Sequence, residues 1–266
     1  MTYSYTQLAH YLACPTRYRY RYLDGWQEKD VRASMLFGRA FEKALGAYFR
    51  REDPGQALFE QWSVYRDHAL EYSNGDTWDK MLGQGVHMLE LFAQDDRVRI
   101  PRPRQNLEIK LTRGLPRGND FLAYIDAIGQ LDGKRTLIDW KTTSARYPEQ
   151  PEGLLALDPQ LVCYSWATGE ANVAFVVFVR KRLPEIQYLC ATISQERRDQ
   201  FARLVEQTVG QISSAQFAPR SGIRFPQNGC VSCAHLGLCL DRQPLVDSKL
   251  IRRAPGELDW LDEIAC

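Results

Sequence analysis

The sequence contains no apolar run close to the roughly 20 residues that a helix needs to cross a bilayer. Its opening residues, MTYSYTQLAHYL, lack the charged, apolar and cleavage regions of a secretory signal. An excess of one charge is also missing, because 34 Lys and Arg against 33 Asp and Glu leave a formal net charge of +1. We therefore expect a cytoplasmic protein without a membrane partner, which meets any nucleic acid through a local basic patch.

Internal repeats and low-complexity linkers are absent too. Hydrophobic residues at 44% and charged residues at 25% lie in the ordinary globular range and exclude a chain that is disordered throughout. At about 150 residues per domain, 266 residues predict one large domain or one domain with an appended lobe. Seven cysteines, an odd number without an export signal, argue against a disulfide framework.

Apolar spacing predicts a helical first third and a strand-rich middle. Helical spacing marks residues 4–13, with Ser4 as a candidate N-cap, and residues 33–50, 55–72 and 77–94. Strands are expected at 104–112, 120–131, 135–143, 172–181 and 185–193, and further helices at 157–169 and 195–214. Helices followed by hairpins with an inserted helix predict an α/β or α+β fold. The chain beyond residue 217 is expected to be loop-like as far as about residue 242, followed by a tail that contains GELDWLDEI.

Glycine and proline clusters suggest where these parts separate. We expect five segments: an N-terminal helix with the first cysteine (1–32), a helical region (33–103), a sheet-bearing core (104–216), a cysteine-rich segment (217–245) and a tail (246–266).

Two carboxylates and a lysine are predicted to meet on the central hairpin. Asp132-Gly133 is a strong two-residue turn signal, and it lies almost midway between Asp126 and Asp139. Lys141 follows Asp139 by two residues, so both side chains leave the same face of a strand. Carboxylate oxygens among apolar neighbours suit Mg²⁺ or Mn²⁺, which indicates phosphodiester hydrolysis. The alternative is an ordinary ion pair on a solvated strand.

A second candidate site is the C-x2-C-x5-C spacing of Cys230, Cys233 and Cys239. Three ligands need a fourth, and Cys14 before Pro15 is the first candidate, while His235 is an alternative in a zinc site. The spacing does not separate zinc from a [4Fe-4S] cluster. With either metal, we expect a structural clasp between the N-terminus and the C-terminal region.

Other conspicuous side chains are expected to serve the core. Cys163 and Cys190 fall in apolar helix- and strand-like runs, and Trp62 and Trp78 have helical spacing. We assign no functional role to them.

Cations alternate with aromatic rings at Arg17, Arg19 and Arg21, a composition suited to phosphate contacts and base stacking on a single strand. The alternative is a helix that packs its tyrosines beside the cysteine site and exposes its arginines. Further basic clusters, Arg97, Arg99, Arg102 and Arg104 and residues 180–182, are candidates for a channel but more often form solvated faces.

The order of these motifs resembles the RecB-like branch of the PD-(D/E)XK nuclease superfamily, in particular its iron-sulfur members. CRISPR-associated RecB-like exonucleases and the AddB nuclease domain are examples. The matching segments are the cysteine region from Ser4 to Gly25, the helix motif from Gly38 to Leu45, Asp126, the run from Ile138 to Thr143, and Gln160 with Tyr164.

The resemblance implies a PD-(D/E)XK core, with a mixed central sheet flanked by helices, and roles for individual residues. Asp126, Asp139 and Lys141 would be catalytic, and Glu42, Asp126 and Asp139 would hold the metal. The remaining implied groups are the [4Fe-4S] ligands Cys14, Cys230, Cys233 and Cys239 and the DNA-positioning pair Gln160 and Tyr164. Glu42 departs from the branch, which usually has His at that position.

We therefore expect a Mg²⁺- or Mn²⁺-dependent exonuclease acting on single-stranded DNA or DNA ends, in DNA processing, repair or CRISPR adaptation. Its partners would be DNA and proteins of those pathways. One alternative is a catalytically weak DNA-end-binding or scaffolding protein that retains the fold and cluster. Another is a zinc-stabilised binding module with an incidental acidic hairpin.

Overall fold

The computed structural model describes residues 1–151, 153–220 and 228–253. The GELDWLDEI tail lies outside the described residues. The chain forms two compact units. Unit one comprises Met1–Val31, Gly114–Phe121 and Arg203–Cys266, and unit two comprises Arg32–Arg113 and Leu122–Ala202.

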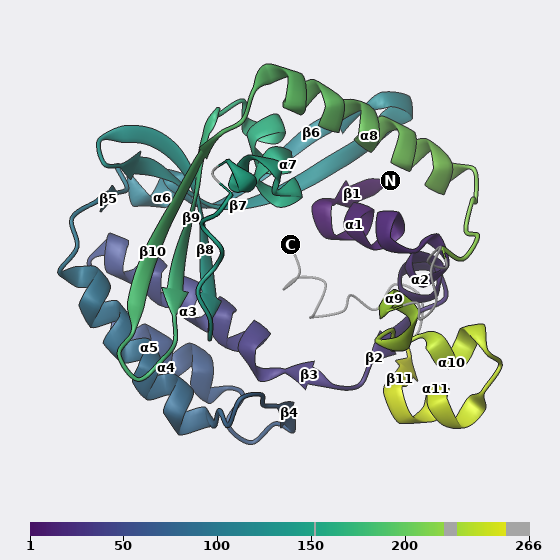
Figure 1. The fold of residues 1–266 in the computed structure, drawn as a ribbon, viewed down its shortest axis with the longest axis horizontal. Coiled ribbons are helices and arrows are strands. Elements are labelled where there is room, and N and C mark those ends of the chain that lie inside the picture. Colours follow the sequence, from purple (N-terminus) through teal and green to yellow (C-terminus); the bar gives the residue numbers. More distant parts are fainter. Residues whose placement is uncertain (152, 221–227, 254–266) are drawn as a thin grey trace. The chain divides into compact units, whose positions relative to one another are not determined.

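A mixed sheet organises unit two (Figure 1). Strands β7 (Asn119–Leu131), β8 (Lys134–Thr143), β9 (Asn172–Val179) and β10 (Glu185–Thr192) are adjacent in that order, and β5 (Val98–Arg99) and β6 (Leu107–Leu115) also pair with β7. The β7–β8 and β9–β10 pairs are antiparallel, whereas β8–β9 is parallel. A parallel pair requires a crossover, which here contains helix α7 (Pro159–Thr168).

The other helices of unit two are α3 (Ala33–Arg50), α4 (Pro54–Ser63), α5 (Trp78–Ala93) and the short α6 (Pro103–Asn106). Helix α3 packs on β8, and α7 packs on β8 and β9. The core between α3, α5 and the sheet is aromatic: the Phe178 ring centroid lies 4.8 Å from that of Phe41 and 5.4 Å from that of Phe92. The α/β fold predicted from the sequence, with a mixed sheet flanked by helices, is confirmed.

The turn between β7 and β8 forms where the sequence predicts it. Asp132 and Gly133 both have positive φ, 50° and 79°, as a tight two-residue hairpin requires. Leu131 pairs with Lys134 on either side of the turn. The guanidinium of Arg97, the residue before β5, donates to Asp132 at 2.6 and 2.9 Å and so holds the turn in place.

Unit one joins segments that are far apart in the sequence. Its first part contains β1 (Thr2–Ser4), α1 (Tyr5–Ala13), α2 (Pro15–Tyr18), the π-helix η1 (Arg19–Leu23) and β2 (Trp26–Glu28). Ser4 caps α1 in a reciprocal capping box with Gln7, as its position predicts. Helix α8 (Gln195–Ser213) leads into the last part, where α9 (Asn228–Val231), α10 (Leu236–Cys239) and α11 (Gln243–Lys249) precede β11 (Leu250–Arg252). Strand β11 pairs antiparallel with β2.

Three sequence expectations were wrong in detail. The helix expected at 55–72 ends at Ser63, because the residues after Trp62 present no apolar stripe and Val64 is exposed. The strand expected from 104 begins at Leu107, after α6. The loop-like cysteine segment contains α9 and α10, and Gly237 packs so closely on α11 that a Cβ would lie 2.7 Å from the Val246 nitrogen. Such short helices carry too few apolar positions for periodicity to reveal them.

Among the helices of the described residues, none combines the length and the apolar character that crossing a bilayer requires.

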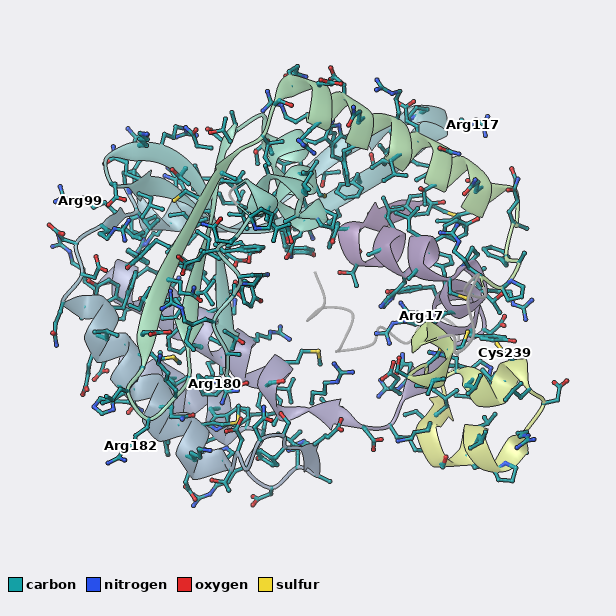
Figure 2. The ribbon with its side chains drawn as sticks, viewed as in Figure 1. Arg17, Arg99, Arg117, Arg180, Arg182 and Cys239 are labelled. Atoms are coloured by element: carbon teal, nitrogen blue, oxygen red, sulfur yellow. The ribbon has the colours of Figure 1, made fainter. Side chains whose placement is uncertain are left out.

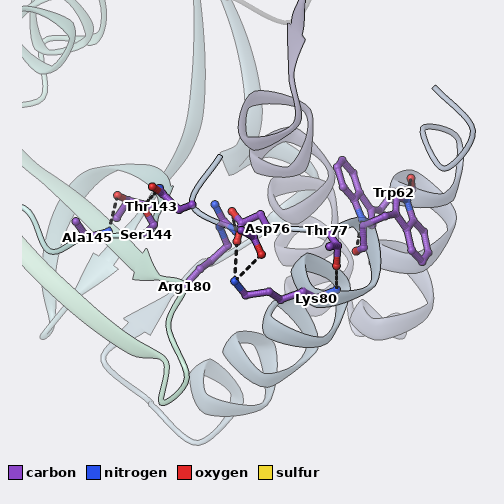
Figure 3. A network of polar contacts seen from close by, with 11 residues as sticks. Trp62, Asp76, Thr77, Lys80, Thr143, Ser144, Ala145 and Arg180 are labelled. Carbon is purple, nitrogen blue, oxygen red and sulfur yellow. Dashed lines mark hydrogen bonds and ion pairs between the residues drawn. The ribbon is translucent and has the colours of Figure 1, made fainter. Parts of the chain in front are cut away.

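A buried ion pair connects the end of β9 to the segment before α5 (Figure 3). Arg180 Nη1 lies 3.0 Å from Asp76 Oδ2, and both side chains are buried. The Arg180 backbone nitrogen donates to the Thr143 carbonyl at 2.6 Å, and Lys80 adds a second contact to Asp76 at 3.3 Å. The network therefore fixes the end of β8, two residues beyond Lys141.

Replacing Arg180 with Ala is expected to lower the free energy of unfolding by about 3 kcal/mol, because a buried carboxylate would lose its main partner. Chemical denaturation measures the change. Lys181→Ala is the matched control: its ion pair with Glu185 is partly exposed to solvent, so its loss should change stability by less than about 0.5 kcal/mol. Equal effects of the two variants would contradict the role of the buried pair.

Candidate active site

The hairpin brings Asp126 and Asp139 to the same end of the β7–β8 ladder. Ala127 pairs with Ile138, so the two aspartates are the next residue on each strand. Asp126 Oδ2 accepts a hydrogen bond from the Trp140 backbone nitrogen at 2.8 Å. Asp139 is 1% exposed, and Asp126 is half-buried. Two carboxylates are thus held close together and largely away from water.

Lys141 connects these carboxylates to helix α7. Its Nζ lies 2.5 Å from Asp139 Oδ2 and donates to Gln160 Oε1 at 2.8 Å. Gln160 Nε2 in turn donates to the Tyr164 hydroxyl at 2.9 Å. The four side chains form one continuous polar chain from β8 to α7, and we call it the Lys141 relay.

Helix α7 presents these groups because its first turn is fixed. Asp158 caps the helix by accepting from the backbone nitrogens of Gln160 and Leu161 at 3.0 and 2.9 Å. Gln160 and Tyr164 are four residues apart and therefore lie on one helix face. Tyr164 is buried, so the relay ends inside the protein.

Glu42 of α3 completes a group of three carboxylates. Burial raises the pKa of Glu42 to about 7, and the charges of Glu108 and Asp139 contribute. Burial also raises the pKa of Asp126 well above its ordinary value, followed by the charges of Asp139 and Glu42. Each carboxylate therefore makes its neighbours harder to ionise, which is the situation that a bound cation would relieve.

Lys141 is the cation that opposes this negative charge. Burial alone would lower its pKa, but Asp139 and Asp126 raise the pKa above the ordinary lysine value, so the ammonium form is retained. Lys43 also opposes the rise in the pKa of Glu42, but its Nζ is paired with Glu108, so the carboxylates remain in surplus. The donor set left over, all carboxylate oxygens, is the type that hard divalent cations prefer.

Glu108 was not anticipated from the sequence. It lies in β6 with a φ of 49°, unusual for a residue other than glycine, and its Oε1 is 2.5 Å from Lys43 Nζ. It raises the pKa of the adjacent Glu42. A single Glu in an alternating strand carries no distinguishing signal in one sequence, so only the fold reveals that it adjoins the site.

A family model for the PD-(D/E)XK nuclease superfamily matches residues 2–240 of the chain. The chain belongs to this superfamily. Its members use divalent metals, which agrees with the surplus of carboxylates around Lys141. No curated protein sequence matches the chain with significant similarity.

Several solved structures are similar to this superfamily member. They include a candidate exonuclease from Eubacterium rectale (13% identity, 71% of this chain and 70% of that chain covered, TM-score 0.46). Another is the protein SSO0001 (17% identity, 81% and 88% covered, TM-score 0.36). A third is LHK-Exo in complex with dAMP (14% identity, 68% and 91% covered, TM-score 0.32).

The four cysteines expected to hold a cluster all lie in unit one of this PD-(D/E)XK chain. Cys14, Cys230 and Cys233 are half-buried, and Cys239 is exposed. Burial raises the pKa of Cys233 and Cys239, and the thiol of Cys14 raises both further. The Cys14 thiol is therefore close enough to those of Cys233 and Cys239 for their charges to interact. Within residues 1–151, 153–220 and 228–253, no group of three or more His, Cys, Asp or Glu side chains is placed to hold a single metal ion.

His235, the alternative fourth ligand, is buried beside these cysteines. Its ring stacks on Tyr20 with centroids 6.2 Å apart, and its Nε2 lies 3.4 Å from the Trp26 carbonyl oxygen. The Tyr20 hydroxyl also hydrogen-bonds to Cys239. Tyr20 thus contacts both His235 and Cys239.

The arginines of the Arg17–Arg21 run point in different directions. Arg19 is exposed and pairs with Asp24 at 3.1 Å. Arg17 and Arg21 are half-buried, and together with burial their charges lower the pKa of His10 to about 3. The charge of Arg17 also opposes the rise that burial causes in the pKa of Cys233. Figure 2 labels Arg17 and Cys239 within unit one.

The other basic clusters are dispersed. Arg180 is buried in its pair with Asp76, so it lies neither on a solvated face, which the sequence favours for this cluster, nor along a channel. Arg97 is committed to Asp132. Arg99 and Arg182 extend outward from unit two (Figure 2).

The core assignments were confirmed with one exception. Trp62 and Trp78 are buried and stacked with centroids 6.2 Å apart, and Cys163 is buried. Cys190 was expected in the core but is exposed, because β10 is the last strand of the sheet order.

Asp126→Asn is expected to raise the free energy of unfolding in EDTA by about 1 kcal/mol, because it removes one of three mutually repelling carboxylates. The Asn side-chain oxygen still accepts from the Trp140 nitrogen. Asp120→Asn, on the same strand but exposed and outside the group, should change stability by less than about 0.5 kcal/mol. Thermal or chemical denaturation compares the two variants. If Asp126→Asn is less stable than the native chain, repulsion between the carboxylates does not limit the stability of the site.

Proposed function

We propose that this chain is a metal-dependent DNA exonuclease of the RecB-like branch, which hydrolyses phosphodiester bonds at single-stranded or frayed ends. The observation that carries the proposal is the Lys141 relay beside Asp126 and Glu42. It combines a surplus of carboxylates, a retained ammonium group and a buried anchor. A solvated ion pair has no need of the Gln160 and Tyr164 contacts.

Glu42, Asp126 and Asp139 would hold Mg²⁺ or Mn²⁺, with Glu42 in the place that His occupies in most of the branch. When bound, the metal supplies Lewis-acid polarisation of the phosphoryl group and a hydroxide near neutral pH. Asp126 is oriented by the Trp140 nitrogen and Asp139 by Lys141. The three carboxylates are not yet placed around one point in the described residues, so a bound metal would draw them together.

Lys141 would donate hydrogen bonds to the negative charge that develops on the phosphoryl oxygens. Asp139 and Gln160 each engage its Nζ, which restricts the long side chain to one direction. A donor fixed before the reaction stabilises the transition state without a reorganisation cost. Gln160 and Tyr164 would act as positioning residues for Lys141 and for the DNA strand.

The role in the cell that we propose is processing of DNA ends, of which repair and CRISPR adaptation are examples. Arg17, Arg19 and Arg21 are proposed to contact the phosphate backbone. Arg19 is the most accessible of the three, and Arg17 and Arg21 are half-buried.

Lys141→Ala should reduce DNA cleavage at least about 100-fold, the size of effect seen when one transition-state donor is removed. The measurement is degradation of end-labelled single-stranded and duplex DNA with Mn²⁺, Mg²⁺ or EDTA. Lys134→Ala, an exposed lysine at the other end of β8, is the matched control and should cut like the native chain. DNA binding without cleavage under any metal would instead favour the scaffolding function.

We also propose that Cys14, Cys230, Cys233 and Cys239 hold a [4Fe-4S] cluster. Each thiolate of such a cluster binds a different iron, so the sulfurs need not converge on one ion. The electrostatic proximity of Cys14 to Cys233 and Cys239 supports this assignment. The cluster would join α2 to the α9–α10 segment within unit one.

The anaerobically purified chain should be brown and contain about four iron atoms, and Cys239→Ser should lose colour and iron and unfold more easily. Visible absorbance, iron analysis and thermal denaturation measure these properties. Cys190→Ser, another exposed cysteine but outside the cluster, should retain all of them. A colourless native chain with one zinc would overturn the assignment.

A further inference from the structure

An apolar pocket of about 430 Å³ adjoins the Lys141 relay in unit two. Its lining includes Tyr147, Phe175 and Tyr188, together with Leu154 and Leu157 of the short 3-10 helix η3 (Leu154–Leu157). Leu157 is 55% exposed. The volume of the pocket falls in the range of small-molecule sites. Large exposed apolar side chains around a hollow commonly mark a binding surface.

The pocket shares a wall with the candidate active site. Lys141 Nζ lies 5.1 Å from the Phe175 ring centroid, and Phe175 pairs with Asp139 across β8 and β9. Asp158, which caps the helix of Gln160, also lines the pocket. A nucleotide whose phosphate reaches Lys141 would therefore have its base or sugar near this pocket.

The aromatic wall is fixed in place. The Tyr147 ring meets the Phe175 ring edge-on at 80°, with centroids 6.0 Å apart. Buried Gln187 accepts from the Tyr147 backbone nitrogen at 2.9 Å and donates to its carbonyl at 3.2 Å. Phe175 is 4% exposed and lies behind the wall, so the accessible rings are those of the half-buried Tyr147 and Tyr188. An arriving aromatic group thus meets an ordered surface, which reduces the entropy cost of binding.

The pocket offers no cation to a phosphate. Its described lining contains no lysine or arginine, and it carries two acids, Glu149 and Asp158. Both acids are engaged elsewhere, Glu149 with Arg146 and Gln187 and Asp158 with the start of α7. What remains is a surface for a flat, uncharged group.

We propose that this pocket binds the unpaired base of the nucleotide next to the bond that is cut, an inference that rests on the nuclease function proposed above. Stacking on an aromatic wall tolerates any base, so sequence preference would be weak. A base in a duplex must first leave its stack, which costs free energy. The pocket would therefore favour single-stranded or frayed ends.

The test compares Leu157→Asp with Leu183→Asp. Both leucines are exposed, at 55% and 79%, but only Leu157 lines the pocket. Cleavage of single strands with Mn²⁺ gives kcat/KM for strands with a normal terminal nucleotide and for strands with an abasic one. The abasic nucleotide is placed at each end of the strand in turn. Binding in EDTA of strands with 2-aminopurine at either end gives a second readout.

In the native chain and Leu183→Asp, removing the terminal base should lower kcat/KM about tenfold, the size of one lost stacking contact. Leu157→Asp should lower kcat/KM for the normal strand about tenfold, and removing the terminal base should then lower it no further. The 2-aminopurine signal on binding should disappear in this variant. Native-like denaturation would show that Leu157→Asp folds.

Two outcomes would overturn the inference. If the native chain cuts DNA and Leu157→Asp responds to the abasic strand as the native chain does, the inference alone fails. If the native chain neither binds nor cuts DNA, the proposed function fails with it. Self-association that Leu157→Asp abolishes, with unchanged cleavage, would assign the pocket to a second copy of the chain and also overturn the inference.

Discussion

The register between β7 and β8 depends on a turn of two residues, Asp132 and Gly133, that both adopt positive φ. A slip of one residue would turn every side chain of β8 to the opposite face of the sheet. Asp139 and Lys141 would then lie among the aromatic rings between the sheet and α3, where neither charge has a partner. The contact of Arg97 with Asp132 and the buried pair of Arg180 with Asp76 fix the two ends of β8.

Packing on both sides of β8 holds like charges together. On one side, Trp140 and the rings around Phe178 anchor α3, which supplies Glu42. On the other side, α7 supplies Gln160, which receives Lys141. The hydrophobic core thus stabilises an arrangement of carboxylates that is unfavourable by itself, and a divalent cation bound there would relieve the repulsion between them.

Features governed by neighbouring residues could be predicted from the sequence. The capped helix after Ser4, the helix of residues 33–50 and the turn at Asp132 each follow from local chemistry, and the turn in turn predicts that Asp126 meets Asp139. Other features depend on tertiary packing. The contact of Lys141 with Gln160 joins residues 19 positions apart, and the position of Glu108 depends on where β6 docks. The spacing of apolar residues along the sequence predicts neither the Lys141–Gln160 contact nor the position of Glu108.

Unit one is assembled from three separate stretches of chain, and this affects how the protein folds during synthesis. The Tyr11 hydroxyl donates to the Gln216 carbonyl, and β2 pairs with β11. At about 5–20 residues per second, the ribosome needs roughly ten seconds or more to supply these partners after the first helices emerge. Until then the aromatic side chains of α1 and α2 lack their native cover. The helices α1 and α2 therefore complete their packing only after the last part of unit one has been synthesised.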